Sequence, residues 1–231
     1  MSSISDAELQ AEAAARGLPL SDTVALRLAL THKSLVPDRP LESNERLEFL
    51  GDSVLGLVIN EYLCVAFPDR LEGELAKAKA LIVCKDALAA ASRRLNLTPL
   101  ILLGRAEEAM GGRNRDSIIA DAFEALIAAI YYERGYAAAR DFILTQLAPE
   151  IAHVVAVRDW RDPKSILQEM RQATRRLPPV YRVVHEQGRP HDRIYVIEAI
   201  LDGKVAGTGQ GKTKKEAQQG AAEAALAKLA E

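Results

Sequence analysis

Acidic residues lie in two segments of this sequence that otherwise have the pattern of apolar helices. Glu45, Glu48 and Asp52 follow one another at i, i+3 and i+7, a spacing that places all three on one face of a helix. The second apolar segment carries only Asp121 and Glu124, which are three residues apart. Two apolar helices therefore each present neighbouring carboxylates.

Unpaired carboxylates in apolar surroundings are costly and tend to take up protons. A divalent cation reverses that balance, and a hard cation such as Mg²⁺ takes carboxylate, water and phosphate oxygens as ligands. The chemistry that this favours is hydrolysis of a phosphodiester, in which the metal polarises the phosphoryl oxygen, lowers the pKa of a bound water and offsets charge on the leaving oxygen. The alternative is that these acidic residues are solvated helix faces or partners for arginine.

The elements that must position these carboxylates are helices. Periodic segments rich in alanine and leucine dominate residues 1–150, and strand patterns are nearly absent there. Gly51 and Gly56 lie inside the first acidic helix, where each costs ~1 kcal/mol relative to alanine. A helix tolerates such glycines if something must approach its backbone closely. Breaks between helices are expected at Gly17–Pro19, Pro37–Pro40, Phe67–Gly73, Gly104 and Gly111–Arg115.

The pattern changes at Asp162. A helical segment, 165–176, is followed by β-branched, alternating runs at 180–185 and 194–201, a third strand at 204–209 and an alanine-rich helix at 214–229. We therefore predict a mostly α domain over residues 1–150, a short, partly ordered linker at 151–161, and a small α+β domain with the order α-β-β-β-α over residues 162–231.

Composition narrows the class of protein. The chain has 231 residues and a net charge of −2, but residues 162–231 hold 12 basic and 9 acidic side chains, whereas residues 1–161 hold 18 and 23. An acidic front and a basic tail fit a metal-using body with an anion-binding appendage. Cys64 and Cys84 show no metal-ligand spacing, and neither a membrane span nor a secretory signal is expected. We therefore expect a cytoplasmic protein.

The segment Asn44–Ser53, NERLEFLGDS, resembles the signature helix of the ribonuclease III family, the metal-dependent endonucleases of double-stranded RNA. Three further segments agree with the family in order and spacing: ALTHKS at 29–34, DAFEALIAAIY at 121–131, and DPKS at 162–165 before the α-β-β-β-α pattern. The resemblance covers residues 26–229. It implies the ribonuclease III endonuclease fold followed by the double-stranded-RNA-binding fold.

The resemblance also implies roles for individual residues. Its metal-binding, catalytic carboxylates correspond to Glu48, Asp52, Asp121 and Glu124. Glu45 matches an acidic position tied to substrate and active-site structure.

Three other positions carry expectations from the same resemblance. Glu72 matches an acidic position proposed to assist the site, although the neighbouring Glu74 leaves that assignment open. Phe49 matches a position that inserts into the partner subunit of a homodimer, with Leu50, Val54 and Leu55 as either interface or ordinary core. His32 falls in a block that is structural in the family.

Three regions of the second domain are implied to bind duplex RNA. They contribute Gln168, Gly188, His191, Lys212, Lys214 and Lys215. Lysines at a helix N-terminus reinforce the preference of its backbone N–H groups for anions. The chain departs from the family twice: the proline of the turn that ends at His191 is shifted by one position, and Gln218 stands where a third lysine is common.

We therefore expect a homodimeric, Mg²⁺-dependent endoribonuclease, with Mn²⁺ as a possible substitute and no organic cofactor. The implied products carry 5′-phosphate and 3′-hydroxyl ends, and the implied substrates are structured precursors including ribosomal RNA. The alternatives are a non-catalytic regulator that binds double-stranded RNA, and a hydrolase of another phosphate compound.

Overall fold

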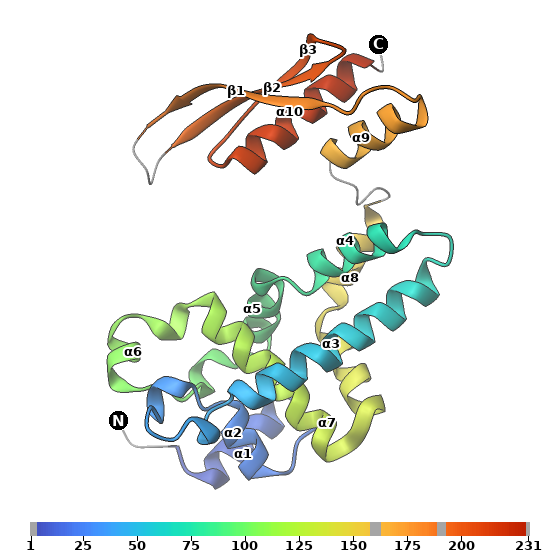
Figure 1. Ribbon diagram of the computed structural model, residues 1–231. Helices are drawn as coiled ribbons and strands as arrows, with labels where there is room; N and C mark the ends of the chain where they lie inside the picture. Colours follow the sequence, from blue (N-terminus) through green and yellow to red (C-terminus); the bar gives the residue numbers. More distant parts are fainter. Residues whose placement is uncertain (1–3, 158–162, 189–192, 230–231) are drawn as a thin grey trace. The chain divides into compact units, whose positions relative to one another are not determined.

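Apolar residues at helical spacing run through the first two thirds of the chain, and a computed structural model shows them folded into helices (Figure 1). The structure describes residues 4–157, 163–188 and 193–229. Contacts within the chain divide it into two compact units, Met1–Arg158 and Asp159–Glu231. We call them the helical unit and the α+β unit.

The helical unit follows most of the breaks expected from the sequence. The breaks at Gly17–Pro19 and Pro37–Pro40 lie between helical elements, and Gly104 caps a helix start. The junction of two helices at Val83–Cys84 was not predicted, because neither residue is glycine or proline. The α-helices of this unit are α1 (Asp6–Ala15), α2 (Thr23–Ala29), α3 (Glu45–Ala66), α4 (Glu72–Ile82), α5 (Lys85–Arg94), α6 (Arg105–Ala109), α7 (Asp116–Gln146) and α8 (Ala148–Ala156).

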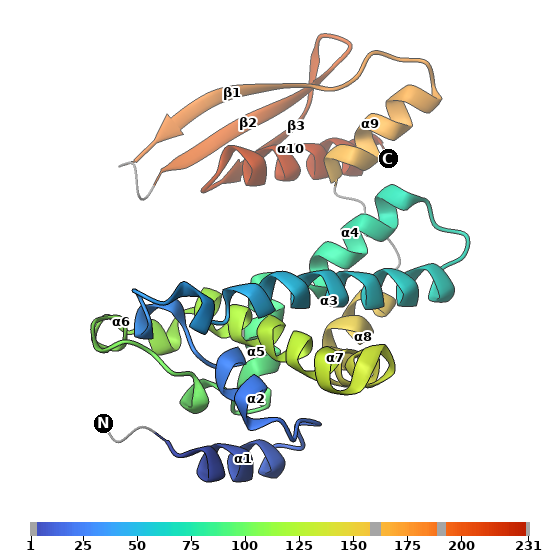
Figure 2. The same cartoon turned by 60° about the horizontal axis from the view of Figure 1, so that its bottom comes forward.

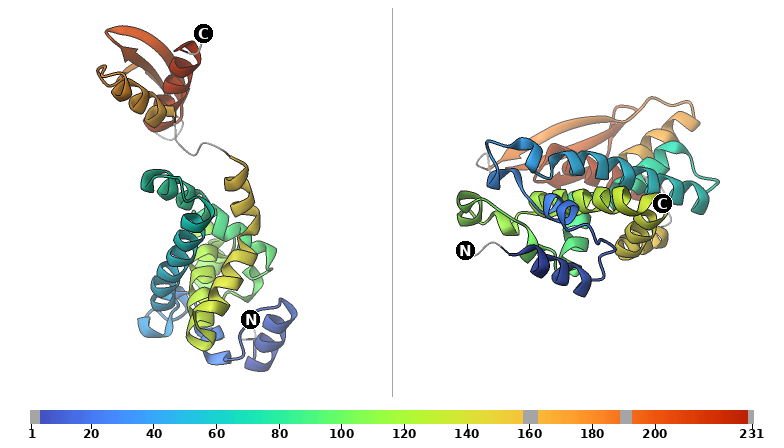
Figure 3. Two further views of the ribbon diagram at one scale, coloured as in Figure 1. Left: turned by 90° about the vertical axis from the view of Figure 1, so that its right-hand side faces the viewer. Right: turned by 90° about the horizontal axis from the view of Figure 1, so that it is seen from below.

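Helices α3 and α7 form the centre of the helical unit. They run side by side over much of their length, as Figure 2 and the right-hand view of Figure 3 show. The side chains of Leu55, Ile59, Phe123, Leu126 and Ile130 are all at most 1% exposed. This apolar contact fixes how the two acidic helices lie against each other.

The closest approach between the two helices is at Gly51. A Cβ atom built on Gly51 would lie 1.8 Å from the backbone carbonyl oxygen of Glu124, so any side chain there would collide with α7. This confirms the expectation that a glycine inside the first acidic helix marks a close backbone approach. Gly56 meets a softer neighbour, the Nζ atom of Lys79 on α4, at 3.0 Å from its built Cβ.

Helix α7 contains a kink that we did not predict. Gly135 has φ 77° and ψ −177°, a conformation that suits glycine because it has no Cβ. The kink divides α7 into the part that carries Asp121 and Glu124 and a second part that leads to α8.

Among the described helices, α3 is long and apolar enough to cross a membrane by length and composition alone. Its packing along α7 and its carboxylates at Glu45, Glu48 and Asp52 are those of a core helix. We therefore assign α3 to the helical unit, with one side packed on α7 and another exposed.

The α+β unit has the predicted element order. Its elements are α9 (Pro163–Ala173), β1 (Val180–Gln187), β2 (Ile194–Leu201), β3 (Lys204–Gly211) and α10 (Lys214–Leu229). The strands pair antiparallel in the order β1-β2-β3. Leu167 of α9 and the alanines of α10 pack on one face of the sheet over Ile197, Ala199 and Leu201. The fold class expected from the sequence, a mostly α domain followed by a small α+β domain, is confirmed.

The division between the units lies beyond the start of the proposed linker, 151–161. Helix α8 extends to Ala156, and Ile151 and Val154 bury their side chains in the helical unit. The rest of the proposed linker, from residue 158 onward, lies outside the described residues. We propose that the linker is shorter than the sequence pattern indicated.

The crossing at Gly51 yields a prediction for stability. Replacing Gly51 with alanine inserts a methyl group into the backbone of α7, and we expect the free energy of unfolding to fall by ~1–3 kcal/mol or more. Chemical denaturation monitored by circular dichroism measures this loss.

Gly73→Ala is the matched control, because Gly73 lies in α4 with no neighbouring atom within 4 Å of a built Cβ. Alanine there should be neutral or stabilising by up to ~1 kcal/mol. Equal stability of the Gly51 and Gly73 variants would contradict the close crossing.

Candidate metal centre and RNA interface

Three carboxylates from α3 and α7 meet at one place. One ligand oxygen from each of Glu48, Asp121 and Glu124 lies within 4.8 Å of the other two, and all three residues are half-buried. Glu48 belongs to the first turn of α3, whereas Asp121 and Glu124 are one turn apart on α7. The crossing at Gly51 lies one turn from Glu48 and holds the two helices close enough for this meeting.

The cluster makes Glu124 a weak acid. Burial, followed by the charges of Asp52, Glu48 and Asp121, raises the pKa of Glu124 from 4.5 to about 8. Near neutral pH a proton on Glu124 therefore relieves the repulsion when no cation is bound.

Burial is also the largest cause of the raised pKa of Glu48 and of Asp121. The charges of Asp121 and Glu45 add to the shift at Glu48. At Asp121 the His32 imidazole, when it is protonated, and the Lys33 ammonium oppose the shift. The site thus concentrates negative charge that the surrounding cations only partly offset.

Asp52 borders the cluster. Its side chain is exposed and is not among the three that meet within 4.8 Å. Its charge is nevertheless the largest charge contribution to the raised pKa of Glu124, which places the two carboxylates near each other. Asp52 is therefore in position to act on the solvent side of the cluster.

This donor set suits a hard divalent cation. It offers carboxylate oxygens, whereas nitrogen and sulfur donors suit softer metals such as zinc. The raised pKa values indicate that nearby positive groups do not balance the negative charge of these carboxylates. A bound cation would supply that balance. Glu48, Asp121 and Glu124, with Asp52 beside them, are the residues that could hold it.

Two further acidic candidates lie outside the cluster. Glu45 forms an exposed ion pair with Lys33, at 2.9 Å between Nζ and Oε1. Glu72 begins α4 and is exposed, and α4 packs on the later part of α3 through Lys79 and Gly56. Within one chain, the structure does not bring Glu72 to the three carboxylates.

The structure separates Glu72 from Glu74, which the sequence could not. The Glu74 carboxylate accepts hydrogen bonds from the Arg70 side chain, at 2.8 Å, and from the backbone N–H of Leu71, at 3.2 Å. It thereby caps the start of α4, whereas Glu72 faces solvent. Glu72 is the one of the two that is available for another partner.

His32 has a structural environment. Its side chain is 8% exposed, and its Nδ1 accepts a hydrogen bond from the backbone N–H of Ser34, which caps the short helical turn Lys33–Leu35. Burial lowers the pKa of this imidazole. These contacts fit the structural role expected of its sequence block.

Phe49 points away from the core and is 79% exposed. It lines a hollow of about 630 Å³ whose rim includes Leu41 and Tyr132, each 70% exposed. By contrast, Val54 and Leu55 are 6% and 1% exposed, so they belong to the core. An exposed aromatic side chain beside a hollow lined mainly by apolar residues is typical of a surface that another protein covers.

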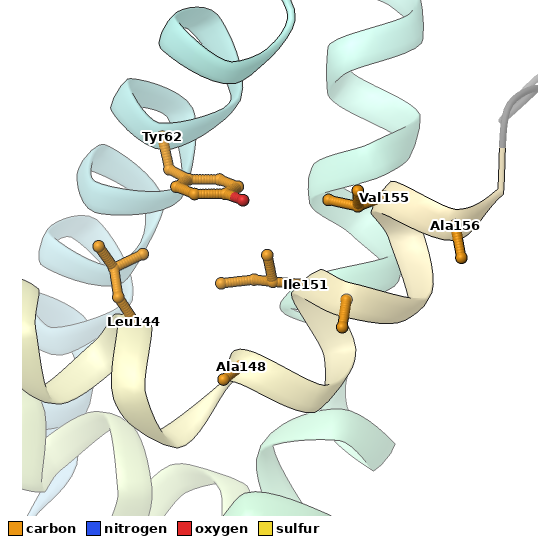
Figure 4. A pocket seen from close by; sticks show the side chains of 7 residues that line it. Tyr62, Leu144, Ala148, Ile151, Val155 and Ala156 are labelled. Carbon is orange, nitrogen blue, oxygen red and sulfur yellow. The ribbon is translucent and has the colours of Figure 1, made fainter.

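A separate hollow of about 460 Å³ lies between α3, α7 and α8 (Figure 4). It is lined by Tyr62, Leu144, Ala148, Ile151, Ala152, Val155 and Ala156. It contains none of the carboxylates discussed above and is not part of the metal centre.

The α+β unit presents the proposed RNA-binding residues on its surface. Gln168 is exposed on α9, and Gly188 follows β1 with φ 107°. Lys212, Lys214 and Lys215 are all exposed around the start of α10. His191 lies outside the described residues.

The sequence analysis covered the segments of two cations near these sites, ALTHKS and DPKS, but assigned neither cation a partner. In the structure Lys33 pairs with Glu45 beside the acidic cluster, and Lys164 contacts α10 from α9. Only the fold shows which side chains meet.

Comparison with known proteins matches each unit to the family that its sequence resembles. Residues 22–151 match the family described as Ribonuclease-III-like, and residues 163–229 match the double-stranded RNA binding motif. Ribonuclease 3 of Desulforamulus reducens is 48% identical over 87% of this chain and 83% of its own length. Ribonuclease 3 of Heliobacterium modesticaldum is 45% identical over 91% of this chain and 90% of its own.

A solved structure resembles the helical unit. The nuclease domain of ribonuclease III from Campylobacter jejuni has a TM-score of 0.55 and 38% identity, and it covers 64% of this chain and 99% of its own. That Campylobacter structure is described as showing structural flexibility in a region involved in dimer formation.

The raised pKa of Glu124 predicts how metal-free stability depends on pH. Between about pH 4.5 and about pH 8 the folded protein keeps a proton on Glu124 that the unfolded chain has released. The free energy of unfolding must therefore fall as pH rises through this window. Thermal unfolding in a chelating buffer from pH 5 to 8.5 should show a falling Tm.

Glu124→Gln removes this ionisation and should reduce the pH dependence. At pH 8 the variant should have a Tm a few degrees above that of the parent, and near pH 5 the two should agree. Identical slopes of Tm against pH in both proteins would contradict the assigned burial of charge.

Proposed function

Since the chain belongs to the ribonuclease III family of double-stranded-RNA endoribonucleases, we propose that it cleaves duplex RNA with Mg²⁺ held by Glu48, Asp52, Asp121 and Glu124. The observation that carries this proposal is the meeting of three carboxylates within 4.8 Å at the α3–α7 crossing. Mn²⁺ is the proposed substitute, because it takes the same oxygen ligands.

Bound Mg²⁺ supplies Lewis-acid chemistry, which stabilises charge on the phosphate and makes a water a stronger nucleophile. In the proposed reaction the water oxygen bonds to phosphorus while the bond from phosphorus to the 3′ oxygen breaks. The water gives up a proton and the 3′ oxygen gains one, which leaves 5′-phosphate and 3′-hydroxyl ends. Glu48, Asp121 and Glu124 serve this reaction as preorganised ligands on two rigid helices, and Asp52 completes the set at the solvent side.

The α+β unit is proposed to hold the duplex. A-form RNA is recognised through 2′-hydroxyls in its shallow minor groove and through phosphates across its narrow major groove. Exposed Gln168 supplies a polar group for the 2′-hydroxyls of the minor groove. Lys212, Lys214 and Lys215 supply cations for the phosphates across the major groove. The N-terminal backbone N–H groups of α10 add to this attraction for phosphate.

We also propose that the protein acts as a homodimer. Phe49, 79% exposed, lies beside the hollow rimmed by Leu41 and Tyr132, so a second copy could cover this apolar surface. In a two-fold dimer each copy would offer both the side chain and the hollow. Glu45 and Glu72, which lie outside the cluster, keep their proposed supporting roles for substrate and site.

The proposed cellular role is the processing of structured RNA, including ribosomal and messenger RNA precursors, in the cytoplasm. Cys64 and Cys84 are both exposed and free, which suits a reducing compartment.

The main alternative is a regulator that binds double-stranded RNA without cutting it. The retention of all four acidic residues supports the enzyme, because binding alone gives no reason to keep repelling carboxylates in an apolar helix pair. The α+β unit with its duplex-binding family match weighs against hydrolysis of another phosphate compound.

Cleavage and binding should separate in the Glu124→Gln variant. Wild-type protein should cut a long RNA duplex only when Mg²⁺ is present. The variant should bind the same duplex normally but cut it orders of magnitude more slowly, since metal-based stabilisation is worth several kcal/mol and each ~1.4 kcal/mol is tenfold in rate. Single-turnover cleavage beside a gel-shift titration measures both properties.

Absence of metal-dependent cleavage by the wild type would overturn the enzyme in favour of the binding-only regulator. Near-normal cleavage by Glu124→Gln would refute its role as a metal ligand. Loss of binding together with cleavage would show that the carboxylates and the RNA grip are not separate functions.

Phe49→Ala should weaken the dimer without unfolding the chain, because Phe49 is exposed in a single copy. A central aromatic at an interface is typically worth about 2 kcal/mol or more, which corresponds to at least a ~30-fold rise in the dimer Kd. Sedimentation over a concentration series measures it. Met110→Ala, which truncates another exposed side chain, is the control, and an undiminished dimer in the Phe49 variant would place that residue outside the interface.

A further inference from the structure

Lys164, the second residue of α9, reaches across to α10. Its Nζ donates a hydrogen bond to Oε1 of Gln218 at 2.6 Å and lies 4.8 Å from the centre of the Tyr181 ring on β1. The backbone N–H of Lys164 donates to Oε1 of the adjacent Gln219 at 3.1 Å. These contacts fix the position of the ammonium group over the side of α10, although Lys164 belongs to another helix.

This position continues the row of cations at the start of α10. Gln218 lies four residues after Lys214 and three after Lys215, so the three side chains share one face of the helix. The charge of Lys164 is therefore held one helical turn beyond Lys214 and Lys215. Gln218, which is neutral, contributes the hydrogen-bond acceptor rather than the charge.

The charge of Lys164 is not neutralised within the described part of this unit. Its partners there are an amide oxygen and an aromatic ring, and neither carries a formal charge. Arg171 and Arg182 differ, because Asp202 and Glu198 pair with them. An ammonium group has three donors, so Lys164 can bind an anion while it stays hydrogen-bonded to Gln218.

We propose that Lys164 is a phosphate-binding residue of the RNA interface, held by Gln218 so that it extends the row formed by Lys214 and Lys215. This inference rests on the proposed binding of duplex RNA by the α+β unit. A cation one turn farther along α10 gives the unit another contact to the phosphate backbone of the duplex.

The test measures the salt dependence of duplex binding by the full chain in metal-free buffer, where cleavage is not expected. Each phosphate contact that is lost reduces the slope of log K against log salt concentration by about one. Lys164→Gln keeps a hydrogen-bonding side chain and should lower the slope by that amount, whereas Lys164→Arg should keep it. Lys228→Gln, at the exposed far end of α10, is the control and should leave the slope unchanged.

A charge swap separates the role in binding from a role in holding α9 to α10. The double variant Lys164→Gln, Gln218→Lys returns one cation to the same place from the other helix, and it should restore the slope lost in Lys164→Gln. A lowered Tm in Lys164→Gln with an unchanged slope would overturn the proposal, because Lys164 would then be only a structural tether.

Comparison with Lys214→Gln distinguishes this inference from the proposed function. If Lys214→Gln lowers the slope and Lys164→Gln does not, duplex binding by α10 stands and the role of Lys164 is refuted. If the wild-type chain binds no duplex RNA, the proposed function itself fails, and the role of Lys164 falls with it.

Discussion

The close crossing of α3 and α7 is the constraint on which the candidate site depends. Gly51 brings the backbone of α3 against the carbonyl of Glu124, and a side chain at this point would force the helices apart. Because Glu48 lies three residues before Gly51, the same contact that fixes the helix distance also fixes the distance between the carboxylates. The packing of α3 along α7, with Leu55 and Ile59 of α3 buried, maintains that geometry along the helices.

This arrangement stores electrostatic repulsion. Burial raises the pKa of all three clustered carboxylates. Neighbouring carboxylates add to this rise at Glu48 and at Glu124, where the pKa reaches about 8. The apolar core holds these groups together on α3 and α7, and a cation bound between them would offset their charge. The result is a rigid set of oxygen ligands, which suits a reaction in which positioning and charge stabilisation matter more than movement of the protein.

Helix α10 has two different faces, one buried against the sheet and one exposed and positively charged. One face consists of buried alanines, Ala217, Ala221, Ala222 and Ala225, which let the helix lie close against the sheet. The start of the helix carries exposed lysines, and Gln218 receives the ammonium of Lys164 from α9. The positive row is therefore built by two helices that are about 50 residues apart along the chain but adjacent in the fold.

The sequence by itself determined the fold class, the element order of the second unit and the acidic pairs, because each depends on local spacing. The i, i+3 spacing of Asp121 and Glu124, the alternation in 194–201 and the glycine inside the first acidic helix are all local patterns. Tertiary structure alone decided which carboxylates meet: Glu48, Asp121 and Glu124 come together, Asp52 borders them, and Glu45 turns to Lys33. It also separated Glu72 from Glu74, exposed Phe49 while burying Leu55, and placed Lys164 beside Gln218. The physical reason is that such relations depend on how helices cross, and a crossing is set by side chains far apart in the sequence, which no local spacing encodes.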